Sequence, residues 1–223
     1  AFFFRGADAA KIPESMYFSE DGFRLVQGGK ESVDFYDETI LRTINLTFSQ
    51  ADWWQQLTNN YVSEVEIPAD LAMDGVTCPG VGVRFKGQTS YQQTGTSKKK
   101  SFNISLDFTD STRTPMGYKT LNLLNCSGDP SYLHAVLYSH IARQYIPTPK
   151  VNLVKVVING ESWGIYANAQ QFNNEFLADF EKAMGGAKGI RWKVPGSPGG
   201  RGSLAYIGDD VEAVCRKVSA EKG

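Results

Sequence analysis

The residues best suited to chemistry in this sequence are five cations that flank one polar loop. Arg84 and Lys86 lie two residues apart, so on a β-strand their side chains share one face. A run of three lysines, residues 98–100, follows the loop at residues 88–97, and alternation turns the middle lysine away from its neighbours. Antiparallel strands meet at the loop that joins them, so the pattern predicts that these cations gather at one rim. Fixed cations and backbone N–H groups suit a polyphosphate, whose negative charge is spread over several oxygens.

Other interpretations of the polar residues stay open at this point. A lysine triplet at the end of a hairpin is commonly a solvated charge run. Gln170 and Gln171 could orient a ligand, although two glutamines in isolation are usually polar surface. His134 and His140 lack an accompanying Ser or Cys motif, which favours a structural role for both. The sequence contains no P-loop, no G-x-S-x-G, no H-E-x-x-H and no dinucleotide fingerprint.

Composition and charge exclude several classes of protein. With 223 residues, of which 41% are hydrophobic and 21% charged, the chain can bury a sizeable core. A net charge of −1 argues against a general nucleic-acid binder, because such domains carry a strong positive excess. No apolar run approaches the roughly 18–20 residues of a membrane span. The three cysteines have no metal-type spacing, which argues against a zinc site.

The elements that must position the cations are predicted from hydrophobic periodicity and turn residues. Asp74-Gly75 and Asn159-Gly160 favour tight turns, because both residues of each pair tolerate a positive φ. Strands with alternating or apolar patterns are expected at residues 65–71, 81–87, 102–106, 118–124, 151–158, 162–169 and 190–194. Helices are expected after capping signals: Ser49 before residues 50–57, Asp129-Pro130 before an apolar stripe over residues 133–145, and Asn173 before residues 175–180. This order predicts an α+β fold, with a mainly antiparallel sheet and flanking helices.

Several stretches in this order resemble the CotH family, which is named for a bacterial spore-coat kinase. The resemblance covers roughly residues 35–210. It is carried by residues 83–90 (VRFKGQTS), 99–102 (KKSF), 159–166 (NGESWGIY) and 170–177 (QQFNNEFL), and residues 191–198 (RWKVPGSP) resemble a bacterial branch of the family.

The resemblance implies a fold, an activity and a division of the chain. The fold would be the N-terminal part of a diverged protein-kinase-like fold. The activity would transfer phosphate from ATP, with Mg²⁺, to hydroxyls of a partner protein of unknown identity. The chain would then consist of an irregular segment (1–35), a CotH-like nucleotide-binding region (36–210) and a truncated C-terminal segment (211–223).

The resemblance also implies roles for particular residues. The loop at residues 87–97 would lie near the triphosphate, with Lys99 or Lys100 binding phosphate, and Arg84 and Lys86 would add positive field. Gln170 stands where many family members have a Glu that pairs with the lysine. A neutral amide would hold that lysine less firmly, because it cannot balance the charge.

The family's catalytic and metal-binding acids lie in an Asp-then-Asn segment and a Trp-Asp-x-Asp-like segment, and neither follows Asp210. We therefore expect the magnesium ligands to lie outside this chain, and this fragment to be inactive although its parent is a kinase. The alternative is a non-catalytic cell-surface or spore-coat adhesion module of the same fold. The content of Trp and Tyr allows a third hypothesis, a carbohydrate-associated domain. CotH-like proteins often act at spore coats, cell surfaces or outside the cell, so the resemblance favours an extracytoplasmic location.

Overall fold

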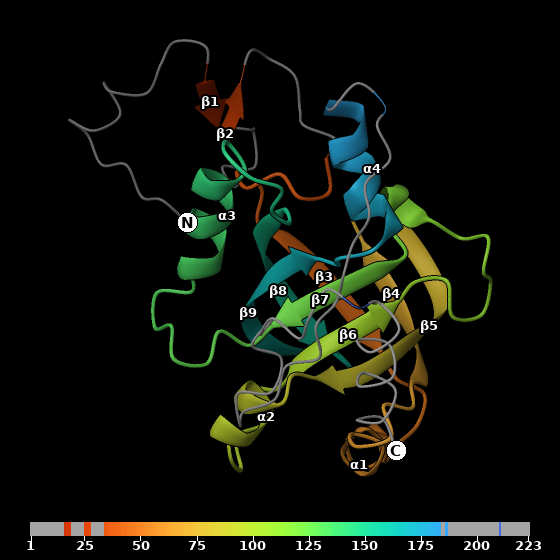
Figure 1. The fold of residues 1–223 in the computed structure, drawn as a ribbon. Coiled ribbons are helices and arrows are strands. Elements are labelled where there is room, and N and C mark those ends of the chain that lie inside the picture. The colour runs from red at the N-terminus through yellow and green to blue at the C-terminus, as the bar shows by residue number, and fades with distance from the viewer. Residues whose placement is uncertain (1–15, 19–24, 28–33, 184–185, 187–209, 211–223) are drawn as a thin grey trace. The chain divides into compact units, whose positions relative to one another are not determined.

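A computed structural model describes residues 16–18, 25–27, 34–183, 186 and 210. The chain divides into two units, residues 1–187 and 188–223, and the elements below belong to the first. Within the described residues, seven strands form a closed barrel in the order β3-β4-β5-β6-β7-β9-β8 (Figure 1). Their bounds are β3 (Arg42–Thr47), β4 (Ile67–Met73), β5 (Val76–Lys86), β6 (Ser101–Ser105), β7 (Thr120–Leu124), β8 (Val151–Ile158) and β9 (Glu161–Gln170). A separate two-stranded sheet pairs β1 (Met16–Phe18) with β2 (Leu25–Gln27).

Closure of the barrel depends on β3, which pairs with a different strand on each side. Leu46 lies opposite Leu71 in the antiparallel pairing with β4. Ile44 lies opposite Val156 in the parallel pairing with β8. The other neighbouring strands of the barrel are antiparallel, so the barrel is mixed. Closure gives both edges of the sheet a partner.

The interior of the barrel is filled by one apolar face from each strand. On β5, Val81, Val83 and Phe85 are fully or almost fully buried, and the residues between them point outwards. The same alternation turns the following side chains inwards from other strands: Ile44, Leu46, Leu71, Phe102, Ile104, Leu121, Leu123, Val154 and Val156. Because the strands cover one another's apolar faces, this core needs no layer of helices.

The helices are short and lie at the ends of the barrel. They are α1 (Trp53–Asn59), α2 (Thr89–Gln93), α3 (His134–Ala142) and α4 (Asn174–Ala183). Figure 1 shows α1 at one end of the barrel and α3 and α4 at the opposite end. Aromatic side chains pack at both ends, with Trp53, Trp54 and Trp163 around α1, and with Phe35, Tyr36 and Tyr118 at the other end.

The predicted α+β fold with flanking helices, with its likeness to the N-terminal part of a kinase-like fold, is wrong. The structure is a closed mixed barrel with a few short helices. The error comes mainly from β3, which lies in a stretch for which no strand was predicted. Its parallel partner β8 is far away in the sequence, so no local pattern indicates that the sheet closes on itself.

Both predicted hairpins are confirmed, whereas two predicted helix starts are displaced. Asp74 and Asn159 have φ values of 49° and 48°, and each precedes a glycine with positive φ. Helix α1 begins at Trp53, after Asp52 rather than Ser49. Helix α3 begins at His134, because Tyr132 has a φ of 61° that interrupts the expected helix.

The predicted apolar stripe of α3 is also wrong. Val136 and Ser139 are the residues that this helix buries, while Leu137, Ile141 and Tyr145 are exposed. The polar loop at residues 88–97 contains the short helix α2. The helix predicted after Asn173 is confirmed as α4, and the strand expected at residues 190–194 lies outside the described residues.

Replacing Ile44 with Ala tests whether β3 closes the barrel. Ile44 is fully buried opposite Val156, so we expect Ile44→Ala to lower the free energy of unfolding by about 2–5 kcal/mol. Thr43→Ala, on the neighbouring and less buried position of the same strand, should cost less than about 1 kcal/mol. Urea denaturation of both variants measures the difference. Equal, small losses would contradict a closing role for β3.

Candidate functional site

Alternation along β5 places two of the predicted cations on the outside of the barrel. Because Val83 and Phe85 point into the core, Arg84 and Lys86 point outwards. Arg84 lies opposite Asn103 on β6, and Asn103 lies opposite Asn122 on β7. These outward side chains, together with Gln171 just after β9, form what we call the outer polar face. Its members are Arg84, Lys86, Asn103, Asn122 and Gln171.

A chain of hydrogen bonds fixes this face around Asn122. The Lys86 ammonium and Asn103 Nδ2 both donate to Asn122 Oδ1, the latter at 3.0 Å. Asn122 Nδ2 donates to Gln171 Oε1 at 2.9 Å and to the Ala169 carbonyl at 3.0 Å. Asn103 and Asn122 are only 5% and 3% exposed, so leaving either amide unbonded would cost about 1–3 kcal/mol. The network therefore holds the Lys86 ammonium in place.

Arg84 has a weaker and more exposed partner. Its Nη1 lies 3.5 Å from Glu64 Oε1, and the Glu64 side chain is 67% exposed. Arg84 also donates to the carbonyl of Phe85 at 3.4 Å. An ion pair with so exposed a carboxylate contributes little to stability, because solvent screens it. A more highly charged anion could therefore replace Glu64 beside Arg84.

The Lys99 ammonium is held by the backbone of β9. It donates to the carbonyls of Trp163 at 3.2 Å and Ile165 at 2.7 Å. It also lies 4.2 Å from the centre of the Tyr166 ring and 5.3 Å from that of Tyr132, which are cation–π distances. Burial lowers the pKa of Lys99. This lysine links the start of β6 to β9.

The Lys100 ammonium instead binds the end of α2. It donates to the carbonyls of Tyr91 at 3.0 Å and Gly95 at 2.8 Å, and to Thr94 Oγ1 at 2.7 Å. Burial lowers the pKa of Lys100, and the side chain is only 5% exposed. A buried ammonium surrounded by carbonyl oxygens fastens the loop at residues 88–97 to β6.

The structure thus brings Arg84 and Lys86 together but gives Lys99 and Lys100 partners of their own. The contacts of these four cations fall into three groups, on the outer face, on β9 and on the end of α2. The remaining lysine of the run, Lys98, is exposed. Phosphate binding by Lys99 or Lys100 stays a prediction, and their observed contacts are with oxygens of the protein itself.

Gln170 lies farther along β9 than the carbonyls that bind Lys99. It pairs with Leu121, near the end of the barrel where α4 follows. Its Nε2 donates to Asp179 Oδ2 at 3.0 Å, and its Oε1 accepts the N–H of Lys150 at 3.1 Å. The lysine that Gln170 helps to position in the structure is therefore Lys150, whereas the resemblance implied Lys99 or Lys100.

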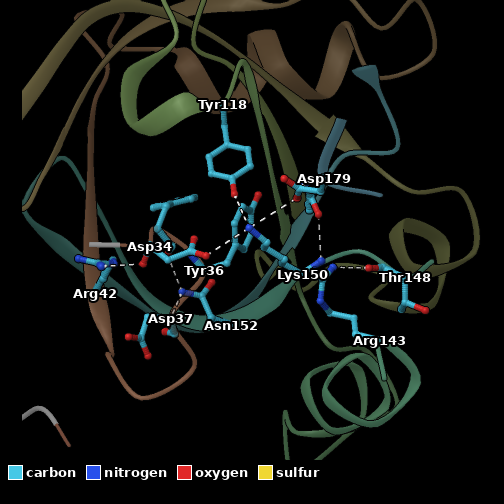
Figure 2. A network of polar contacts seen from close by, with 12 residues as sticks. Asp34, Tyr36, Asp37, Arg42, Tyr118, Arg143, Thr148, Lys150, Asn152 and Asp179 are labelled. Atoms are coloured by element: carbon cyan, nitrogen blue, oxygen red, sulfur yellow. Dashed lines mark hydrogen bonds and ion pairs between the residues drawn. The ribbon is translucent and has the colours of Figure 1, made fainter. Parts of the chain in front are cut away.

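Lys150 is the centre of a group of charges that we call the Lys150 clasp, made of Asp34, Tyr118, Lys150 and Asp179. Figure 2 shows the Lys150 ammonium pointing towards the other three side chains. Its Nζ lies 3.2 Å from Asp34 Oδ2, 3.5 Å from Asp179 Oδ2 and 3.2 Å from the Tyr118 hydroxyl. Burial acts to lower the pKa of Lys150, but Tyr118 and the two carboxylates outweigh it and raise the pKa overall. The clasp ties α4 and the segment before β3 to the barrel.

Sequence reasoning missed Asn103 and Asn122, although a signal for them exists. Each is a single Asn between apolar residues within a predicted strand, a pattern that is typical of a bonded polar group on a sheet. Lys150 and Asp179 carried no such signal, because they belong to different elements and meet only in the folded chain.

Metal clusters and membrane-spanning helices are both absent from the described residues. These residues include no group of three or more His, Cys, Asp or Glu that could hold a metal ion. None of the helices in the same part of the chain is long and apolar enough to cross a membrane.

Part of the chain matches a known protein family. Residues 83–191 match a family model described as CotH kinase protein. No curated protein matches the chain. The matched region contains the outer polar face, Lys99 and Lys100. It also contains three residues of the Lys150 clasp, which are Tyr118, Lys150 and Asp179.

Removing the charge of Lys100 should loosen the loop that it holds. In Lys100→Met the oxygens of Tyr91, Thr94 and Gly95 lose their common donor, so amide hydrogen exchange over residues 88–97 should accelerate about tenfold. Lys98→Met, a neighbouring and exposed lysine, is the matched control and should leave exchange unchanged. Similar exchange in both variants would contradict the fastening role.

A double-mutant cycle tests the Lys150 clasp. We expect Lys150→Met and Asp179→Asn to show a coupling of about 1 kcal/mol in the free energy of unfolding, because the pair is partly buried and shares Gln170. The Lys119–Asp107 pair, 3.2 Å apart and more exposed at its lysine, should couple more weakly. Denaturant unfolding of both cycles provides the comparison. Equal couplings would show that the clasp is no stronger than a surface pair.

Proposed function

Because residues 83–191 match the family model described as CotH kinase protein, we propose that this chain binds ATP on its outer polar face as part of a protein kinase. The full reaction would transfer phosphate to hydroxyl groups of a partner protein. One observation carries the proposal: Arg84 and Lys86 share the outer face of β5, beside the amides of Asn103 and Asn122. Two cations on one rigid sheet, with the ammonium of Lys86 held by the buried amide of Asn122, are suited to hold a polyphosphate.

The two cations would bind the phosphates in different ways. Arg84 has a planar guanidinium that can donate two parallel hydrogen bonds to one phosphate, whereas Lys86 acts as a compact charge. Residues two apart on a strand are about 7 Å apart, a spacing that linked phosphates can bridge. Asn122 already orients the Lys86 ammonium, so little side-chain entropy would be lost on binding.

In this proposal Lys99 and Lys100 do not contact the phosphates but hold the protein segments beside them. Their ammonium groups hold β9 and the loop at residues 88–97, which follows directly after Lys86 and Gly87. A fixed loop beside the cations would limit where a triphosphate can lie. Both lysines are positioning residues in this proposal.

Magnesium enters the proposal only together with ATP. Magnesium that accompanies nucleotides is held largely by phosphate oxygens and water, with one or two carboxylates. The proposal concerns the phosphates alone, which it assigns to Arg84 and Lys86. In a kinase, ATP supplies the phosphoryl group, and the protein contributes position and compensating charge.

Removing both outer cations tests the proposal. Arg84→Gln combined with Lys86→Gln keeps a polar side chain at each position but removes two positive charges, so the affinity for ATP with Mg²⁺ should fall at least about tenfold. Isothermal titration calorimetry of the whole chain measures the change. Lys155→Gln, an exposed lysine on β8, is the control and should bind ATP as the unaltered chain does.

Glu64→Gln provides a variant with the opposite expected effect. It removes the carboxylate that pairs with Arg84, so ATP should bind more tightly, by up to about fivefold. Absence of ATP binding by the unaltered chain would reject the proposal and favour the adhesion module. ATP binding that the Arg84 and Lys86 substitutions leave unchanged would place the site elsewhere.

A further inference from the structure

Helix α3 has apolar side chains on both of its sides. Towards the barrel, Val136 packs with Val151 and Ala167. The opposite side, with the turn that follows the helix, carries what we call the α3 patch. It consists of five large apolar residues that are each at least half exposed: Leu137, Tyr138, Ile141, Tyr145 and Ile146. A helix that is apolar all round is normally buried all round, so the composition of α3 indicates that something covers the patch.

The α3 patch is continuous, whereas the other exposed apolar side chains are scattered. Among the described residues, eleven large apolar side chains are exposed, and five of them lie within residues 137–146. Leu137 and Ile141 are four residues apart, and Tyr138 and Ile141 are three apart, so these side chains lie on one side of the helix. Single exposed apolar residues are ordinary on a protein surface, but a contiguous group marks a surface that binds something.

The small sheet of β1 and β2 needs an apolar surface to pack on. It pairs three residues from each strand, with Phe18 opposite Leu25 and Met16 opposite Gln27. A two-stranded sheet this short is at best marginally stable by itself in water. Because strand positions alternate and paired positions share a face, positions 16, 18 and 25 lie on one face of this sheet. The sequence has Met, Phe and Leu there.

A short stretch of chain joins this sheet to the neighbourhood of α3. Residues 28–33 connect β2 to Asp34, and a fully extended chain from Gln27 to Asp34 spans at most about 23 Å. Asp34 is held by Lys150, and Glu38 Oε2 lies 2.7 Å from Nδ1 of His140 on α3 itself. A tether this short gives the sheet a local concentration of about millimolar at α3, so it competes well against a separate molecule.

We propose that the β1–β2 sheet docks on the α3 patch, with the face that contains Met16, Phe18 and Leu25 against Leu137 and Ile141. Helix α3 then lies between β8 and this sheet, so both of its apolar sides have a partner. The docked sheet extends back to residue 16 the hold that the Lys150 clasp has on the chain before β3. The docking does not depend on the binding of ATP.

Hydroxyl-radical footprinting of the whole chain tests the docking, because the radicals label apolar side chains in proportion to their exposure. Phe18→Thr combined with Leu25→Thr keeps two good strand formers but removes the apolar contacts. We expect labelling of the α3 patch to rise at least about threefold in this variant, relative to labelling of Val62, because losing two apolar contacts outweighs the tether. Tyr17→Thr changes the opposite face of the same sheet and is the matched control, which should leave labelling unchanged.

Leu137→Gln combined with Ile141→Gln tests the docking from the other side. Glutamine is a good helix former, so α3 is kept while its apolar surface is lost. Trypsin cuts after Arg24 and Lys30, which stand on either side of β2 in the sequence. We expect cleavage at these two sites to become about tenfold faster in the variant, because the undocked sheet opens more often. Val62→Gln, at an exposed position just after α1, should leave the cleavage rate unchanged.

The possible results distinguish the β1–β2 sheet from other occupants of the α3 patch. Stronger labelling in the Phe18 and Leu25 variant, together with faster cleavage in the Leu137 and Ile141 variant, supports the docking. Labelling that is equally strong in the unaltered chain and in the Phe18 and Leu25 variant overturns it. Labelling that rises on hundredfold dilution of the unaltered chain, and not with these substitutions, shows that a second copy covers the patch and also overturns it. An equal rise in Tyr17→Thr overturns the assigned face.

Discussion

Dense packing of the barrel interior is the constraint on which the rest of this structure depends. Phe85, Phe102 and Tyr166 are fully buried, and apolar side chains from all seven strands fill the space between them. Small barrels of this kind hold side chains rather than a channel. Because side chains alternate along a strand, every inward residue fixes an outward neighbour. Arg84 and Lys86 therefore take their positions from Val83 and Phe85, and the chemistry of β5 belongs to its outer surface.

The outer polar face is rigid because its polar groups satisfy one another. Asn122 accepts from Lys86 and Asn103 and donates to Gln171, so a change in one amide would leave another unbonded. Buried amides of this kind are costly when unbonded, which favours a single arrangement of the network. A ligand that binds here would meet an ammonium already held in place. Rigidity of the sheet and order in the side chains are thus two results of the same packing.

Local patterns predicted the local parts of the structure, and failed where distant segments meet. The Asp74-Gly75 hairpin, helix α4 and the shared face of Arg84 and Lys86 depend on neighbouring residues, and all three are confirmed. Strand β3 was not predicted, because its parallel partner β8 lies far away in the sequence. The contacts of Gln170 could not be predicted for the same reason, since Asp179 and Lys150 approach it only in the folded chain.

The number of positive charges predicts a phosphate site poorly. A better criterion is whether an anion can displace the groups that already bind each cation. Lys100 is bound by backbone oxygens that cannot leave unless the loop at residues 88–97 unfolds, and burial lowers its pKa, which disfavours its charged form. Arg84 is paired with the exposed side chain of Glu64, which can move into water at little cost. The family match covers both kinds of cation and cannot distinguish them. The distinction comes from geometry: an anion can replace the exposed carboxylate of Glu64 beside Arg84, whereas it would have to break the fold to reach Lys100.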